Sequence, residues 1–221
     1  MKYYAIIVAG GSGQRMKSKL PKQFLELNGK PILMHTLERF YHAKSTISLV
    51  VVLPKSHHTT WNTLCSNHQF KIPHSICEGG ETRFQSVKNG LSFCESESII
   101  AVHDGVRPLV TSTFILNIYR EAELKNAVVP IVPVVEALRK VSNNSNEALD
   151  RSLYYTVQTP QCFSSSILLK SYQQKEKSTF TDDASVVEAF GKKINLFQGE
   201  VNNIKITSSK DLLLAEAILK Q

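Results

Sequence analysis

Short apolar runs rich in Val and Ile recur along the chain, and each of them ends at glycine, proline or polar residues. They cover residues 4–8, 47–53, 98–102 and 127–132. Apolar runs that are continuous rather than alternating are typical of strands buried on both faces, as in a parallel sheet. The pattern therefore predicts four core strands of a mostly parallel sheet.

Segments with helical spacing of apolar residues lie between these runs. They are predicted to form helices over 31–40, 82–93 and 111–124. Pro31 suits the first turn of the first helix, and Thr111 suits the N-cap of the third. Strands that alternate with helices predict an α/β fold, a Rossmann-like open sheet flanked by helices on both sides.

The stretch from residue 134 to residue 155 breaks this alternation. Its polar cluster Asn143–Asn146 lies between two segments that can pair as a hairpin, which predicts an arm projecting from the sheet. A long surface loop is the alternative. Further along, helices are expected over 181–190 and 208–220, and strands over 194–197 and 203–207.

Length, composition and charge narrow the class of protein. With 221 residues, 42% of them hydrophobic, the chain suits a single domain over 1–221. No apolar run approaches the length of a membrane-spanning helix, and the apolar stretch at the N-terminus is too short for a secretory signal. Four cysteines without metal or redox spacing indicate reduced thiols and a cytoplasmic protein. The net charge of +7 is not gathered in a Lys/Arg block, which favours anionic small molecules over nucleic acid.

A glycine-rich loop, Ala9–Met16, follows the first predicted strand. Glycines in this place let backbone N–H groups approach an anion closely. The loop lacks the third glycine of the dinucleotide fingerprint, because Met16 stands there, and it lacks the Gly-Lys-Ser/Thr of a Walker A motif. It is therefore expected to bind a nucleotide in another way, with Arg15 and Lys22 as nearby cations.

Asp104 follows the third buried run, so it is expected at the carboxyl edge of the sheet, where open α/β sheets bind ligands. A carboxylate there suits Mg²⁺, which is usually held by one or two carboxylates together with phosphate oxygens and water. His103, beside it, is interpreted as a structural neighbour and not as an acid or base.

Eight short motifs follow one another along nearly the whole chain: Gly10–Arg15, Pro21–Phe24, Gly29–Pro31, Gly79–Arg83, His103–Pro108, Thr159–Gln161, Thr181–Ala184 and Asn203–Thr207. Together they resemble the 2-C-methyl-D-erythritol 4-phosphate cytidylyltransferase family. The resemblance implies transfer of CMP from CTP to 2-C-methyl-D-erythritol 4-phosphate, with release of pyrophosphate. The substrate phosphate is already ionised at neutral pH, so the reaction needs cations around the reacting phosphorus more than a protein nucleophile.

The resemblance also implies a role for each matching residue. The implied catalytic residues are Arg15, Lys22, Arg151 and Lys205. The implied CTP-binding residues are Ala9, Gly10, Gly11, Gly13, Gly79, Gly80, Arg83 and Ser86. The implied substrate-binding residues are Asp104, Arg107, Arg151, Thr159, Thr181 and Lys205, and Asp104 is the implied ligand of Mg²⁺. The family pattern further implies a homodimer built through the arm at 134–155, in which Arg151 reaches the partner's active site.

Two alternatives remain open. Glu136 and Ala137 stand where many members of the family have an Asp-Thr pair, so a hydroxyl that contacts the substrate is missing. Enzymes that act on ribitol 5-phosphate share most of the other motifs and are the first alternative. The second is a nucleotide-binding module without turnover, which would have no need of cations that act only in the transition state.

Overall fold

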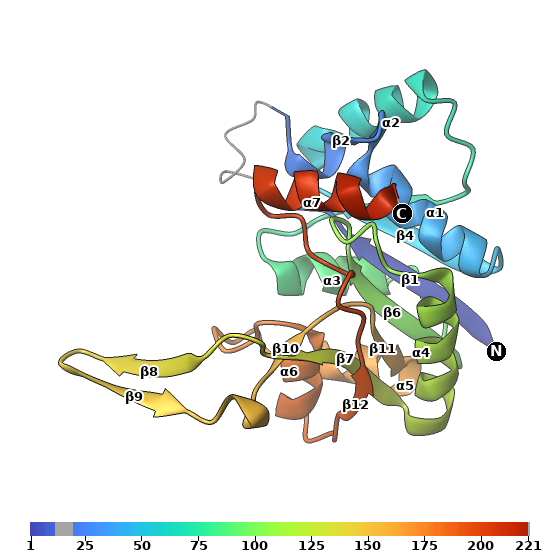
Figure 1. Cartoon of the computed structure of the whole chain (residues 1–221). Coiled ribbons are helices and arrows are strands. Elements are labelled where there is room, and N and C mark those ends of the chain that lie inside the picture. Colours follow the sequence, from blue (N-terminus) through green and yellow to red (C-terminus); the bar gives the residue numbers. More distant parts are fainter. Residues whose placement is uncertain (12–19, 221) are drawn as a thin grey trace.

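The computed structural model describes residues 1–11 and 20–220, which are organised around one large sheet (Figure 1). The predicted core strands are confirmed as β1 (Lys2–Val8), β4 (Ile47–Leu53), β6 (Ser98–Asp104) and β7 (Ala127–Pro133). β5 (Ser75–Glu78) extends the parallel part, in which β6, β1, β4 and β5 are neighbours. The expected α/β fold with a mostly parallel sheet is thus confirmed.

The other half of the sheet is mixed. β10 (Tyr155–Val157) and β11 (Gln161–Ser164) both run antiparallel to β7, and β11 also joins β7 to β6. β12 (Asn195–Gln198) pairs with β7 in parallel. Val157 of β10 lies opposite Ile131 of β7, and Cys162 of β11 lies opposite Val128 of β7. The chain from β10 to β11 thus advances five residues while β7 covers three. The additional residues fall at Gln158–Pro160, where the Thr159–Pro160 peptide bond is cis.

Helices cover both faces of the sheet. One core cluster joins Ala5 and Ile7 of β1 to side chains of α1 (Ile32–Ala43), α2 (His58–Asn67) and α4 (Ser112–Lys125). The other joins Tyr4 and Ile6 to α3 (Arg83–Leu91), α5 (Ser165–Ser171) and α6 (Asp183–Ala189). Successive side chains of a strand point to opposite faces, so a strand between two helical layers is apolar on both faces.

Polar side chains define where several helices begin. Thr82, Thr111, Asp182 and Ser208 accept hydrogen bonds from backbone N–H groups in the first turns of α3, α4, α6 and α7 (Ser209–Leu219). An N-cap of this kind satisfies donors that the helix itself leaves unpaired. α7 packs on the small ribbon of β2 (Glu26–Leu27) and β3 (Lys30–Pro31), in a core cluster of its own. The helices expected from the sequence are confirmed to within a few residues.

The arm is a hairpin that projects away from the body of the molecule (Figure 1). Among the described strands, β8 (Leu138–Ser142) and β9 (Ser145–Leu149) pair only with each other, from Leu138 opposite Leu149 to Ser142 opposite Ser145. The short helical turn η4 (Arg151–Leu153) leads the chain back to β10. The prediction of a hairpin is confirmed, and the alternative of an irregular loop is wrong.

The strand expected over 203–207 is wrong, because this segment is irregular. Its polar groups bond to loops and not to a ladder. The amide of Asn203 donates to the carbonyl oxygen of Thr159 at 2.9 Å, and the backbone N–H of Ile206 donates to the carbonyl oxygen of Val106 at 2.9 Å. A segment with β propensity is thus held across the carboxyl edge of the sheet.

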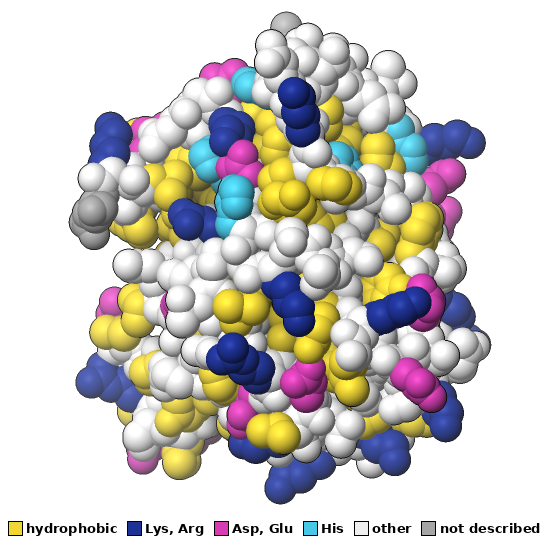
Figure 2. All heavy atoms as spheres, turned by 90° about the vertical axis from the view of Figure 1, so that its right-hand side faces the viewer, with side chains coloured by type: hydrophobic (Ala, Val, Ile, Leu, Met, Phe, Trp, Pro, Cys, Tyr) yellow, Lys and Arg dark blue, Asp and Glu magenta, His cyan; other side chains and the backbone are white. Residues whose placement is uncertain are grey.

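Charged side chains are dispersed over the face that Figure 2 shows, where lysines and arginines stand singly or beside acidic residues. Across residues 1–11 and 20–220, no helix is both long and apolar enough to cross a membrane.

Candidate active site

A cavity of about 270 Å³, here called the first cavity, lies at the carboxyl ends of the parallel strands. Its wall contains Ala9 after β1, Pro54 after β4, Gly79 after β5 and Asp104 at the end of β6. These residues lie together because parallel strands all end at the same edge of the sheet. Ligands bind in this position in open α/β sheets.

The first cavity brings together most of the residues that were expected to bind CTP. Its lining includes Ala9, Gly10, Gly11, Gly79, Gly80, Arg83 and Ser86. Gly13 and Arg15 belong to residues 12–19 and lie outside the described residues. Lys22, expected to be catalytic, also lines the first cavity.

The turn after β5 needs glycine for a steric reason. A Cβ atom on Gly80 would lie 2.3 Å from Cβ of Gln85, at the start of α3. The N–H of Gly80 donates to the hydroxyl of Ser86 at 3.1 Å, and the N–H of Gly79 donates to the carbonyl oxygen of Leu53 at 2.8 Å. Ser86 therefore fixes the turn that forms one wall of the cavity.

Lys22 is placed by the short helical turn η2 (Lys22–Phe24). The neighbouring Gln23 is buried, and its side-chain amide donates to the carbonyl oxygen of Ala9 at 2.6 Å. A Cβ atom on Gly11 would lie 3.4 Å from Cε of Lys22. The anchor at Gln23 thus holds the lysine beside the glycines that follow β1, where an anion would meet both its ammonium group and backbone N–H groups.

A second cavity, of about 300 Å³, lies beside the first. It is lined by Arg107, Thr159 and Thr181, all expected to bind the substrate, and by residues of the Gln158–Gln161 segment. Arg83, Asp104 and Lys205 line both cavities. These three residues therefore mark the boundary at which a ligand in one cavity would meet a ligand in the other.

Asp104 is the centre of a compact charged cluster at this boundary. Its Oδ2 accepts hydrogen bonds from Nε of Arg107 at 3.2 Å and from Nζ of Lys205 at 3.0 Å. Burial alone would raise the pKa of Asp104, but the charges of Lys205 and Arg107 outweigh it and hold that pKa well below its ordinary value. Asp104 is thus an anion, and Lys205, with 43% of its side chain exposed, keeps a cation at the open end of the cluster.

His103 and Thr159 hold the backbone at Asp104 and Arg107 through a chain of hydrogen bonds. Nε2 of the buried His103 faces the carbonyl oxygen of Arg107 at 3.1 Å, so this nitrogen carries the proton. Nδ1 then accepts from the hydroxyl of Thr159 at 3.1 Å, and that hydroxyl accepts from the N–H of Asp104 at 3.0 Å. Burial lowers the pKa of His103 to about 4, so the ring is neutral near pH 7.

Thr159 therefore donates its hydroxyl proton to His103 and accepts a hydrogen bond from the backbone of Asp104, which helps to fix that residue. His103 has the structural role that was expected for it. Thr181 lies at the wall of the second cavity, just before the N-cap of α6, and its N–H donates to the hydroxyl of Ser185 at 3.1 Å.

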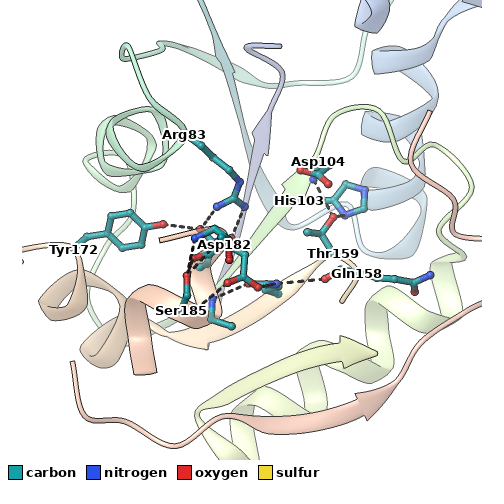
Figure 3. Close-up of polar contacts among 12 residues, drawn as sticks. Arg83, His103, Asp104, Gln158, Thr159, Tyr172, Asp182 and Ser185 are labelled. Carbon is teal, nitrogen blue, oxygen red and sulfur yellow. Dashed lines mark hydrogen bonds and ion pairs between the residues drawn. The ribbon is translucent and has the colours of Figure 1, made fainter. Parts of the chain in front are cut away.

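Arg83 has a partner of its own. Its Nη1 and Nη2 donate to the two carboxylate oxygens of Asp183 at 3.1 and 2.5 Å, and the hydroxyl of Tyr172 donates to Oδ1 of Asp183 at 2.6 Å. In Figure 3 the side chains of Arg83 and Tyr172 point toward the first turn of α6. Burial and the nearby charge of Asp183 raise the pKa of Tyr172 well above its usual value, so its hydroxyl keeps its proton.

Among the described residues, Arg151 is the predicted site residue that the structure does not bring to either cavity. It is exposed on the turn that follows the β8–β9 hairpin, and its guanidinium bonds to the carbonyl oxygen of Val135. Glu136 and Ala137 are likewise exposed, just before β8. The departure from the family pattern at these two positions therefore leaves the described walls of both cavities unchanged.

Sequence reasoning missed the residues that hold the site together. Asp183 belongs to the Thr181–Ala184 motif, but the motif does not tell which distant side chain it pairs with. Gln161 bonds to the first turn of α6 through both ends of its amide: it donates to Oδ2 of Asp182 at 2.8 Å and accepts from the N–H of Ala184 at 2.9 Å. The sequence showed Gln161 only as part of the Thr159–Gln161 motif and gave no signal of its bonds to α6.

The fit to a divalent cation can be judged from Asp104. Within residues 1–11 and 20–220, no three His, Cys, Asp or Glu side chains are grouped so as to hold a metal. Both cations of the cluster bond the same carboxylate oxygen, Oδ2. A single buried carboxylate fits Mg²⁺, which keeps several waters and takes its remaining ligands from substrate phosphates, and does not fit a metal held by protein side chains alone.

Fold and site together define a nucleotidyltransferase: two adjoining cavities at the carboxyl edge of an α/β sheet, with cations where they meet. The family model for 2-C-methyl-D-erythritol 4-phosphate cytidylyltransferase matches residues 3–221. The chain belongs to this family.

Similar proteins agree over the whole length. A 2-C-methyl-D-erythritol 4-phosphate cytidylyltransferase of Phocaeicola vulgatus is 47% identical over 219 residues, covering 99% of this chain and 100% of that protein. One of Porphyromonas gingivalis is 49% identical, covering 99% and 98%. The crystal structure of the Thermus thermophilus enzyme superposes with a TM-score of 0.81 at 29% identity, covering 100% of both chains. The Anaerococcus prevotii synthase gives 0.83 at 26% identity, covering 100% and 97%.

Proposed function

We propose that this protein transfers the CMP group of CTP to 2-C-methyl-D-erythritol 4-phosphate, giving 4-diphosphocytidyl-2-C-methyl-D-erythritol and pyrophosphate, in the synthesis of isoprenoid precursors. The observation that carries the proposal is the pair of adjoining cavities that share Arg83, Asp104 and Lys205. CTP occupies the first cavity and the polyol phosphate the second, so that the reacting groups meet at the shared residues.

The reaction is a single displacement at the α-phosphorus of CTP. An ionised oxygen of the substrate phosphate forms the new P–O bond, the bond to the β-phosphate breaks, and pyrophosphate leaves with its electron pair. No proton has to be removed from the attacking oxygen and no covalent enzyme intermediate is needed. Because both reactants are anions, the chain contributes Lys22 and Lys205 as fixed cations for the charge that develops in the transition state.

Mg²⁺ is part of this proposal, with Asp104 as the residue that holds it. When bound, the ion neutralises charge on the phosphate oxygens and helps to orient them. Asp104 suits this role because its depressed pKa keeps it ionised, and because Arg107 and Lys205 fix the orientation of the carboxylate.

Pyrophosphate release by the purified protein tests the proposed function. We expect turnover with CTP, Mg²⁺ and 2-C-methyl-D-erythritol 4-phosphate, little turnover with ATP or GTP, and a loss of activity in excess EDTA. A parallel assay with ribitol 5-phosphate tests the alternative substrate suggested by Glu136 and Ala137. Faster turnover with ribitol 5-phosphate would reject the substrate, equal rates with ATP would reject the selectivity for cytosine, and full activity in EDTA would reject the metal.

A homodimer built through the arm also belongs to the proposal. The arm and its base expose large apolar side chains: Val135, Val141, Leu153 and Tyr155. A two-stranded hairpin is marginally stable in water on its own, and a second chain packed against these side chains would bury them. The guanidinium of Arg151 lies outside both cavities of its own chain. This position fits the family pattern of an arm that enters the partner's site.

Mixing two inactive variants tests the dimer and the exchange of Arg151 together. In a mixed dimer of Arg151→Ala and Lys22→Ala chains, one of the two sites contains both native residues if the arms are exchanged. Random mixing should then restore about a quarter of the wild-type activity. Absence of recovery, or a fully active monomer at micromolar concentration in sedimentation, would contradict the proposed assembly.

A cytoplasmic location completes the proposal. All four cysteines are unpaired, and Cys77 and Cys162 are buried, as is usual for thiols in a reducing compartment.

A further inference from the structure

Of the three residues at the boundary of the cavities, Arg83 is the one held from outside the Asp104 cluster. Asp104 and Lys205 bond to each other at 3.0 Å. Arg83 instead extends from the first position of α3 to Asp183, the first residue of α6. The ion pair therefore links the helix that follows the glycine turn of the first cavity to the helix beside the second cavity.

The geometry of this pair fixes the plane of the guanidinium. Both terminal nitrogens of Arg83 bond to Asp183, one to each carboxylate oxygen, and Tyr172 holds Oδ1 from the other side. Asp183 is 0% exposed. The ring of Tyr172 stacks on that of Phe84 with centroids 4.7 Å apart, so the hydroxyl is itself anchored beside Arg83. A two-point contact of this kind adds orientation to attraction.

Among the described residues, the Arg83 guanidinium bonds to Asp183 alone, which leaves donors for a ligand. An arginine side chain carries five N–H groups, and the pair with Asp183 takes up two of them. The side chain of Arg83 remains 30% exposed, and it lines both cavities. A pair with a purely structural role could be closed to solvent on all sides, whereas this one presents a charged edge to the boundary of the cavities.

The charge of Arg83 is secure without a ligand. Burial would lower its pKa, but the charge and hydrogen bonds of Asp183 more than compensate and raise the pKa above the ordinary value. The guanidinium is consequently protonated and oriented before any phosphate arrives. A cation that is already in place stabilises a transition state without a cost of reorganisation during the reaction.

We propose that Arg83 is a further catalytic residue, which donates hydrogen bonds to the phosphate group being transferred, and that Asp183, supported by Tyr172, is the positioning residue that aims it. The inference rests on the proposed CMP transfer and deepens it. It differs from a role in binding the base, because a residue at the boundary acts on the step in which the two ligands react.

Steady-state kinetics on a small set of variants test the proposal. Arg83→Gln should lower kcat by ~10²-fold, the usual size for loss of one preorganised charge stabiliser. Asp183→Asn should lower kcat by ~10-fold or more, as loss of an orienting partner does at metal ligands, with a smaller change in KM for CTP. Tyr172→Phe should have a smaller effect in the same direction. Glu38→Gln is the matched control, because it neutralises a carboxylate paired with Lys30 at 2.6 Å outside both cavities.

A double-mutant cycle separates positioning from a general structural effect. If Asp183 acts through Arg83, then Asp183→Asn should cause no further loss of kcat in the Arg83→Gln background. Circular dichroism establishes that each variant is folded, and if Asp183→Asn is not, Tyr172→Phe in the two Arg83 backgrounds takes its place in the cycle. Equal losses in both backgrounds, or a wild-type kcat for Arg83→Gln, would overturn the proposal.

The wild-type enzyme distinguishes this inference from the proposed function. Failure of the wild type to release pyrophosphate from CTP and 2-C-methyl-D-erythritol 4-phosphate would reject the function itself, and with it this inference. Wild-type turnover together with an unaffected Asp183→Asn variant would reject only the role assigned to Asp183.

Discussion

Lys22→Ala is expected to lower kcat by ~10²–10³-fold while the protein stays folded. Lys22 lies beside the end of β1 at the wall of the first cavity, held there by the buried Gln23. Its ammonium group would face the phosphates of CTP, and it is worth most when negative charge builds up during the displacement. The loss should therefore fall on kcat more than on KM. Initial rates of pyrophosphate release over a range of CTP concentrations provide both constants.

Lys125→Ala is the control for this prediction. Lys125 is a lysine of the α4 helix, paired with Glu121 and outside both cavities, so its removal tests the general effect of losing one positive charge. It should leave kcat unchanged. If Lys22→Ala, folded by circular dichroism, turns over at the wild-type rate, the role assigned to Lys22 is wrong.

The second large effect is expected for Asp104→Asn, which should reduce kcat/KM by ~10²-fold or more and shift activation to higher Mg²⁺ concentrations. The substitution removes the negative charge that is proposed to hold the ion, and it leaves Arg107 and Lys205 without their shared anion. Titration of activity with Mg²⁺ measures the shift. An unchanged half-saturating Mg²⁺ concentration would contradict the assignment of Asp104 to the metal. Glu121→Gln, which neutralises a carboxylate of a remote ion pair, is the control.

Asp104 should also contribute to the dependence of stability on pH. Its pKa in the folded protein lies below that of an unfolded chain, which is ~3.9. The ionised group therefore stabilises the fold at every pH above that unfolded value, and this stabilisation is lost as the pH falls through the lower, folded value. The difference in free energy of unfolding between wild type and Asp104→Asn should thus shrink from pH 6 to pH 3. Urea unfolding at several pH values measures it, and a difference independent of pH would contradict the prediction.

The arm illustrates how a local pattern can predict a structure but not its purpose. Two segments around Asn143–Asn146 predicted a hairpin, and β8 and β9 form it. The hairpin forms a two-stranded sheet of its own, so its strand pairing does not determine what the apolar side chains of the arm and of its base pack against. The proposed dimer therefore rests on exposed residues such as Val141 and Leu153 together with the family pattern.

The amino-acid sequence by itself determined those features that depend on near neighbours in the chain. Continuous apolar runs such as 98–102 identified buried parallel strands, because a strand between two helical layers has no polar face. Thr111 marked a helix start, because an N-cap bonds to N–H groups two or three residues further on. The position of Asp104 at the carboxyl edge followed from the strand that precedes it.

Features that join distant parts of the chain were decided only by the tertiary structure. The 203–207 segment has the composition of a strand, yet its polar groups bond to the loops at Thr159 and Val106 and not to a neighbouring strand. The pairing of Arg83 with Asp183 joins residues 100 positions apart. No periodicity encodes such a contact, because it arises when α3 and α6 pack on the same face of the sheet and bury one charge beside the other.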